Sequence, residues 1–131
     1  MLGENIGELS GKITGMRVLE GSKSEVSFQG SGKLLDVEVN TLVTYVAVAR
    51  PDGTLFGDGQ GVIMTKDGET VTFVGKGTGR PTGQGAAASW RGAIYCQTNS
   101  QKLARLNSIV VIFEQENDEN GNASAKFWEW K

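Results

Sequence analysis

The sequence predicts an all-β fold, an antiparallel meandering β-barrel of about eight strands with glycine-rich, coiled strands. Apolar residues recur with a period close to two, and no window shows the 3.6-residue stripe of an amphipathic helix. Short turns rich in Gly, Pro, Asp and Asn separate the strand-like segments. The chain also holds 19 glycines in 131 residues, which lets strands curve strongly enough to close a small barrel.

The first part of the chain is expected to form three strands. Residues 12–20 and 24–40 have the pattern of long, bent strands, and their glycines are candidates for β-bulges. Residues 41–49 are apolar on both faces and rich in β-branched side chains. This segment is therefore expected to be a central strand that is covered on both sides.

Two turn sequences mark hairpins in the middle of the chain. The first contains Pro51, which presets φ, and Gly53, which can adopt a positive φ. The next strand covers residues 54–65 and ends at a second turn, and a further strand covers residues 69–74.

The last part of the chain is expected to form three more strands, over residues 86–98, 106–116 and 123–130. A polar turn joins the last two, and residues 99–106 could hold a short helix or turn. We expect less than about one tenth of the chain to be helical. The whole chain, residues 1–131, is predicted to be a single β-barrel domain.

Several glycines lie two residues apart, which places each set on one face of a strand. The sets are Gly30 and Gly32; Gly57, Gly59 and Gly61; and Gly75, Gly77 and Gly79. A row without side chains lets a strand coil sharply, or lets another backbone or a ligand come close. The rows favour a small, strongly curved barrel over a flat sandwich.

Composition limits the chemistry that this chain can carry. It has no histidine, which excludes a Ser-His-Asp triad, a Cys-His dyad and an imidazole-ligated zinc ion. Its single cysteine, Cys96, is expected to be a free thiol without a catalytic role. An enzyme would have to work with carboxylates, Tyr, Arg, Lys or bound water. No metal and no cofactor are expected.

The expected surroundings are cytoplasmic, with neither nucleic acid nor membrane as a partner. The net charge of −2 excludes a polycationic arm, and the first residues lack the features of a secretory signal. The longest apolar stretch, residues 42–49, is far shorter than the roughly 20 residues of a membrane helix. One cysteine fits a reducing compartment.

Two segments that suggest ligand sites fit structural roles better. Residues 75–80 are similar to a phosphate-binding loop, but the Walker spacing is absent and no helix follows. Residues 118–122 are rich in oxygen ligands but lack the spacing of a calcium loop. Strand curvature and a polar hairpin turn are the favoured interpretations.

Six residues are the candidates for a ligand-binding site inside the barrel. They are Tyr45, Gln60, Trp90, Arg91, Tyr95 and Glu114. Tyr45 interrupts the most apolar strand, Gln60 lies between glycines, and Arg91 shares one strand face with Tyr95. A buried arginine and a buried Glu114 would need each other or a ligand. The tryptophan would supply an apolar wall.

Several segments together resemble the allene oxide cyclase-like group of small barrels, which includes dirigent-like proteins. They are Pro51-Asp52-Gly53-Thr54, Gly75-Lys76-Gly77-Thr78-Gly79, Trp90-Arg91-Gly92, and Phe113-Glu114 with Trp128-Glu129-Trp130. The likeness runs from about Val26 onward, without a diagnostic catalytic motif. It implies an eight-stranded antiparallel barrel, often dimeric or trimeric. Members guide cyclisation or coupling of apolar intermediates in the barrel cavity.

Two functions stay open. The barrel could bind a small apolar molecule and guide a non-covalent isomerisation or cyclisation. Alternatively, it is a non-enzymatic structural or oligomerisation module whose interior is filled by its own side chains. A cavity of roughly a few hundred Å³ would favour the first function, and a filled interior the second.

We also expect a homo-oligomer, a dimer or a trimer. Only one face of each strand points into the barrel interior. An apolar outer face must therefore be buried by something else. Without helices on the outside, the expected cover is another copy of the chain. The expected contacts are residues 42–48 and 109–113, and the aromatic last strand suits either the core or such an interface.

Overall fold

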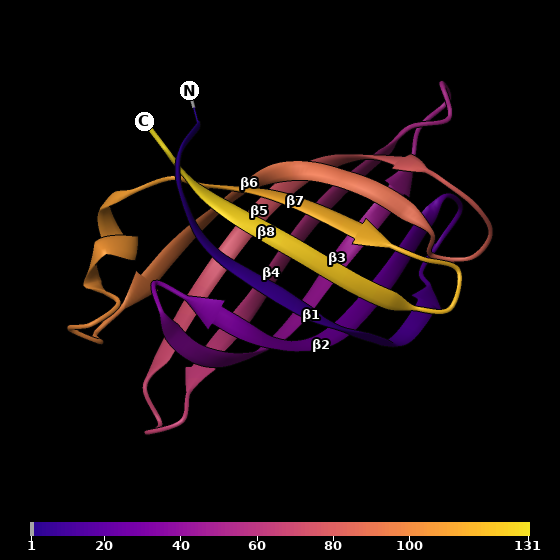
Figure 1. Cartoon of the computed structure of the whole chain (residues 1–131). Helices are drawn as coiled ribbons and strands as arrows, with labels where there is room; N and C mark the ends of the chain where they lie inside the picture. Colours follow the sequence, from indigo (N-terminus) through magenta and orange to yellow (C-terminus); the bar gives the residue numbers. More distant parts are fainter. Residues whose placement is uncertain (1) are drawn as a thin grey trace.

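Eight strands and one short 3₁₀ helix make up the computed structural model, which describes residues 2–131. The elements are β1 (Leu2–Val18), β2 (Lys23–Leu34), β3 (Val37–Ala49), β4 (Leu55–Thr65), β5 (Thr70–Pro81), β6 (Ala88–Thr98), η1 (Ala104–Ser108), β7 (Val111–Asn117) and β8 (Asn122–Trp130). Each strand pairs with the next in antiparallel fashion, and β1 pairs with β8 to close the barrel (Figure 1). The predicted fold is confirmed.

The first strand begins at Leu2, well before the predicted start at residue 12. Its pairing with β8 shifts register on both sides of Asn5. These shifts bring Ile6 and Leu9, three residues apart, into the same buried core. A spacing of three breaks the period of two, so the alternation that marks the other strands is not visible here.

The predicted strand over residues 24–40 is two strands, β2 and β3, joined by a two-residue turn. Leu35 and Asp36 have φ angles of 50° and 64°, a region in which non-glycine residues are uncommon. A tight hairpin turn that matches the strand twist requires this backbone and usually carries Asn-Gly. Because Leu35 and Asp36 are neither Asn nor Gly, the turn lacks the usual residue pattern and was not predicted.

Glycines of β4 and β5 make room for aromatic rings that fill the barrel. The six-membered ring of Trp90 lies on Gly57 and Gly79, where an added Cβ atom would come within 2.9 Å of its carbons. Phe73 packs on Gly61 in the same way. These glycines therefore pack against aromatic side chains of the same barrel. Their spacing alone did not show whether a side chain, another backbone or a ligand would occupy the space.

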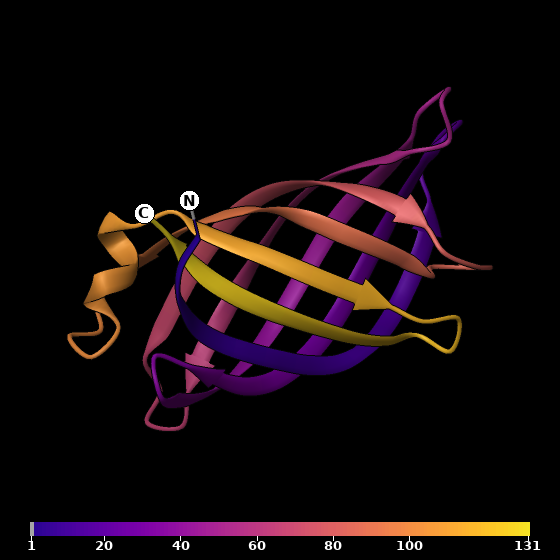
Figure 2. The ribbon, with the colours of Figure 1, turned by 45° about the horizontal axis from the view of Figure 1, so that its top comes forward.

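One end of the barrel is closed by the segment between β6 and β7. Leu103 and Leu106 of this segment are fully buried in the same cluster as Val71 and Val111. Figure 2 shows the segment, with η1, at the end of the barrel where both chain ends lie. Within residues 2–131, no helix is long and apolar enough to cross a membrane.

Candidate functional site

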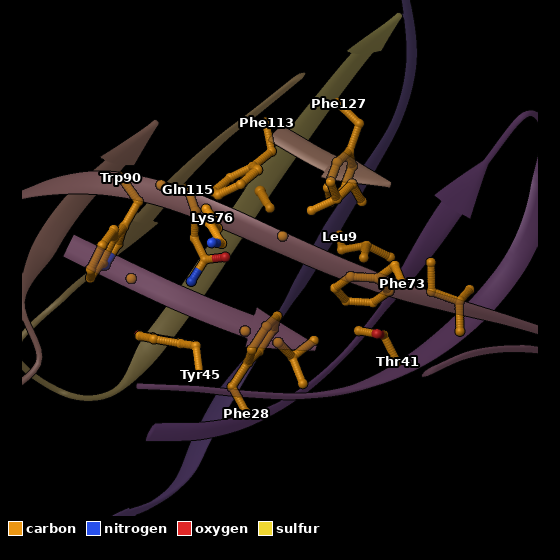
Figure 3. A pocket seen from close by; sticks show the side chains of 18 residues that line it. Leu9, Phe28, Thr41, Tyr45, Phe73, Lys76, Trp90, Phe113, Gln115 and Phe127 are labelled. Atoms are coloured by element: carbon orange, nitrogen blue, oxygen red, sulfur yellow. The ribbon is translucent and has the colours of Figure 1, made fainter. Parts of the chain in front are cut away.

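An apolar cavity of about 90 Å³ lies inside the barrel, among aromatic rings from six strands (Figure 3). We call it the aromatic cavity. Its rings are Phe28, Tyr45, Phe73, Trp90, Phe113 and Phe127. Each ring occupies an inward position, because side chains alternate between the two faces of a strand. Leu9 and Ala125 add to the wall.

A chain of polar side chains crosses the barrel beside this cavity. The Asn117 amide nitrogen donates to the Tyr45 hydroxyl at 3.2 Å, and the Gln115 amide nitrogen donates to the Asn117 oxygen at 3.0 Å. Burial raises the pKa of Tyr45 above its ordinary value, and the hydrogen bond from Asn117 offsets only part of that rise. The phenol is therefore protonated and neutral at physiological pH.

Trp90 stands edge-on to Tyr45, with the ring centroids 5.6 Å apart and the planes at 72°. Its indole is 5% exposed. Among the side chains of residues 2–131, Trp90 Nε1 is the one buried polar atom without a hydrogen-bond partner. Leaving such a donor unpaired costs about 1–3 kcal/mol, so an occupant that accepts its hydrogen would be stabilised here.

The structure brings two of the six sequence candidates together. Tyr45 and Trp90 line the aromatic cavity. In β6 the even-numbered residues face inward, so Arg91 and Tyr95, which are odd, lie on the outside. Adjacent residues of a strand point to opposite faces. Trp90 and Arg91 therefore cannot serve one interior site.

Gln60 and Glu114 also lie on the outer surface. Gln60 is exposed on β4. Glu114 lies 3.8 Å from Arg91, whose Nη1 is also 2.9 Å from Glu116. The arginine and glutamate expected to need each other do meet, but as partly exposed ion pairs, which contribute little to stability. Whether any of the six residues binds a ligand stays a prediction.

Asn117 and Gln115 are site residues that the sequence reasoning missed. Asn117 was expected to belong to the polar turn before the last strand, yet it ends β7 and is 4% exposed. Alternation along β7 from Val111 would have placed Phe113, Gln115 and Asn117 on one inward face.

The side chains of the cavity are neutral hydrogen-bonding groups on an apolar wall. Burial raises the pKa of Cys96 to about 11, so this core thiol stays protonated. Lys76 contributes to the wall, but its ammonium group is exposed on the outer surface, 4.0 Å from Asp58. Among residues 2–131, no group of three or more His, Cys, Asp or Glu could hold a metal ion. The arrangement suits binding of a neutral molecule.

The cavity is small for a ligand site. Ligand pockets usually measure roughly 300–1,000 Å³, whereas this one measures about 90 Å³. Most of the barrel interior is filled by the protein's own side chains.

A second feature is an uncharged apolar area on the outside of β3 to β6, which we call the outer apolar face. It is formed by Leu42, Val62, Val74 and Tyr95, with Thr and Gln side chains between them. Leu42, Val74 and Tyr95 are each about half exposed. The strand that was expected to be covered on both sides therefore has a bare outer side in the single chain.

Comparisons with known proteins identify the fold. No family model matches the chain, and no curated protein matches its sequence. A protein of unknown function from Clostridium acetobutylicum is similar in structure, with a TM-score of 0.81 and 13% identity over 98% of both chains. A beta-barrel like protein from Acinetobacter baumannii matches with a TM-score of 0.79 and 12% identity, over 99% of this chain and 96% of its own.

A protein described as an enzyme, from Penicillium herquei, is also similar. Its TM-score is 0.69 and its identity 15%, over 100% of this chain and 96% of its own. At these identities the likeness shows the fold alone, because one fold can host unrelated functions. The chain is similar to small β-barrel proteins, and the allene oxide cyclase-like group stays a resemblance.

Proposed function

We propose that the protein binds a small apolar molecule in the aromatic cavity. One observation carries this proposal: the apolar cavity is lined by Trp90, whose buried N–H group has no partner within residues 2–131. Buried polar groups are nearly always paired, and exceptions need an explanation. A bound molecule that accepts this hydrogen provides one.

The size and chemistry of the cavity favour reversible binding over catalysis. A space of about 90 Å³ holds a molecule of only a few heavy atoms. The larger apolar intermediates implied by the family resemblance exceed this space. The lining offers the phenol of Tyr45, the amide of Gln115, the hydroxyl of Thr41 and the indole of Trp90, none of which is a strong acid or base at neutral pH. We therefore propose binding without isomerisation or cyclisation.

Titration with xenon, 2-methylpropene and toluene, followed by ¹⁵N–¹H correlation spectra, tests the proposal. Xenon and 2-methylpropene should give saturable shifts at the amides of Tyr45, Trp90 and Ile94. Toluene should give none, because it exceeds the cavity volume. Shifts that are absent, or confined to the outer apolar face, would contradict the proposal.

A matched pair of variants locates the binding. Ala125 lines the cavity, whereas Ala93 lies on the outer surface of β6. Ala125→Val adds two methyl groups to the interior and should abolish binding of 2-methylpropene. Ala93→Val makes the same chemical change outside and should leave the binding unchanged. Dispersed spectra of both variants would show that each is folded.

A non-enzymatic oligomerisation module is the second candidate, favoured by the outer apolar face together with the largely filled interior. The occupant we propose for this face is a second copy of the chain. A symmetric contact presses one patch against the same patch, so it requires a surface without like charges. The outer apolar face meets this requirement because the residues that form it are uncharged.

A further inference from the structure

The polar groups beside the aromatic cavity leave hydrogen-bond donors unused. Asn117 donates to Tyr45 and accepts from Gln115, so both ends of its amide are paired. The Tyr45 hydroxyl accepts that hydrogen bond and keeps its own proton to donate. The indole of Trp90 is a donor only, and its donor is the buried group that stays unpaired.

The packing of Trp90 sets the benzene part of its indole against the glycines of β4 and β5. Around Gly57 and Gly79, the nearest ring atoms are the carbons Cδ2, Cε3, Cζ3 and Cη2. The glycines therefore hold the hydrocarbon part of the indole. The nitrogen is not among the ring atoms nearest to these glycines, and within residues 2–131 no group accepts its hydrogen.

The cavity also selects against charge. The one cationic residue in its wall, Lys76, has its ammonium group in solvent near Asp58. A carboxylate or an ammonium ion inside the barrel would be buried without a counter-ion, which is strongly unfavourable. The occupant should be neutral.

We propose that the ligand of the aromatic cavity is a small neutral molecule with a carbonyl or ether oxygen on an apolar frame, and that this oxygen accepts the hydrogen bond of Trp90 Nε1. This inference rests on the proposed function and adds the chemical class of the ligand. Tyr45, whose ring touches that of Trp90, is placed to donate a second hydrogen bond to an oxygen at this end.

Acetone and 2-methylpropene form a matched pair of probes, because they differ only in a C=O group against a C=CH₂ group. Both are titrated into the wild-type protein and into Trp90→Phe. In the wild type, acetone should move the Trp90 indole N–H proton downfield, and 2-methylpropene should not. In Trp90→Phe, the dissociation constant of acetone should rise about tenfold relative to that of 2-methylpropene, as expected for the loss of one hydrogen bond.

The outcomes separate this inference from the proposed function. If both probes bind, the indole proton stays in place and the ratio is unchanged in Trp90→Phe, the ligand class is wrong and the binding site stands. If neither probe binds, the proposed function fails and the inference with it. The shift of the indole N–H proton is measured in the wild-type protein. It therefore tests the hydrogen bond to Trp90 even if Trp90→Phe does not fold.

Discussion

At the scale of single residues, Trp90 combines two properties that packing alone would not select together. Its hydrocarbon ring fills the space over Gly57 and Gly79, which a phenylalanine could do in part. Its N–H group is buried at a free-energy cost that a phenylalanine would avoid. The unpaired N–H group supports the proposal that the aromatic cavity has an occupant.

Cys96 should react slowly with thiol reagents in the folded state. It is buried, and burial raises its pKa to about 11 from a reference of 9.0. Reaction with a disulfide reagent at pH 8 should therefore follow unfolding, which absorbance at increasing urea concentration can measure. Rapid labelling of the native protein would contradict this.

The same pKa shift links stability to pH. The contribution of the protonated thiol to folding is fully present below pH 9, where the thiol is also protonated in the unfolded chain. It is lost as the pH rises from about 9 toward about 11, because the unfolded state then ionises first. Urea unfolding of the wild type should lose stability over this range faster than that of Cys96→Ala.

Asp36→Gly should stabilise the protein by about 1 kcal/mol, because glycine adopts a positive φ without the steric cost of a Cβ atom. Asp36 is exposed, with a φ of 64°, so the change removes little packing. Asp36→Ala keeps the Cβ atom and should give no gain. Equal midpoints of urea unfolding for the two variants would show that the turn carries no strain.

At the scale of elements, the glycine rows and the aromatic rings are complementary parts of one packing scheme. Gly57→Ala should lower the free energy of unfolding by about 1–3 kcal/mol, the usual cost of overpacking. The added methyl group would lie 2.9 Å from the Trp90 ring. Gly15→Ala is the control, since nothing lies within 4 Å of its added Cβ atom. Similar losses in both variants would point to strand curvature instead.

Strand periodicity was enough to predict the barrel, but not which face of each strand is inside. Arg91 and Tyr95 share a face as predicted, yet the inward face of β6 belongs to Trp90, Ile94 and Cys96. A face with mixed polarity can suit either side when the outer surface is itself partly apolar. Only the pairing with neighbouring strands determines which face of a strand points into the barrel.

Some elements gave no local signal at all. The start of β1 depends on register shifts against β8, and the turn at Leu35 lacks its usual residues. The Asn117–Tyr45 hydrogen bond joins residues 72 positions apart. Such features depend on contacts between residues that are far apart in the sequence. Local sequence patterns therefore do not predict them.

At the scale of the whole molecule, we expect assembly through the outer apolar face. Light scattering at micromolar concentration should give a mass near two times 14.0 kDa if two copies meet through this face, whereas a mass near three times 14.0 kDa would require a different contact. Val74→Glu puts a charge on this face and should shift the mass toward the monomer. Gln29→Glu makes a charge on the exposed side of β2 and should not. A monomeric wild type would exclude this contact.

The pairing of β1 with β8 has a consequence for how the chain folds. Residues such as Gly7 and Phe127 must find each other across nearly the whole sequence, and contacts between distant residues slow folding. Until they meet, the sheet has two free edges that can pair with other chains. Closure removes both edges in one step. Formation of the β1–β8 ladder therefore removes the edges through which the unclosed sheet could aggregate.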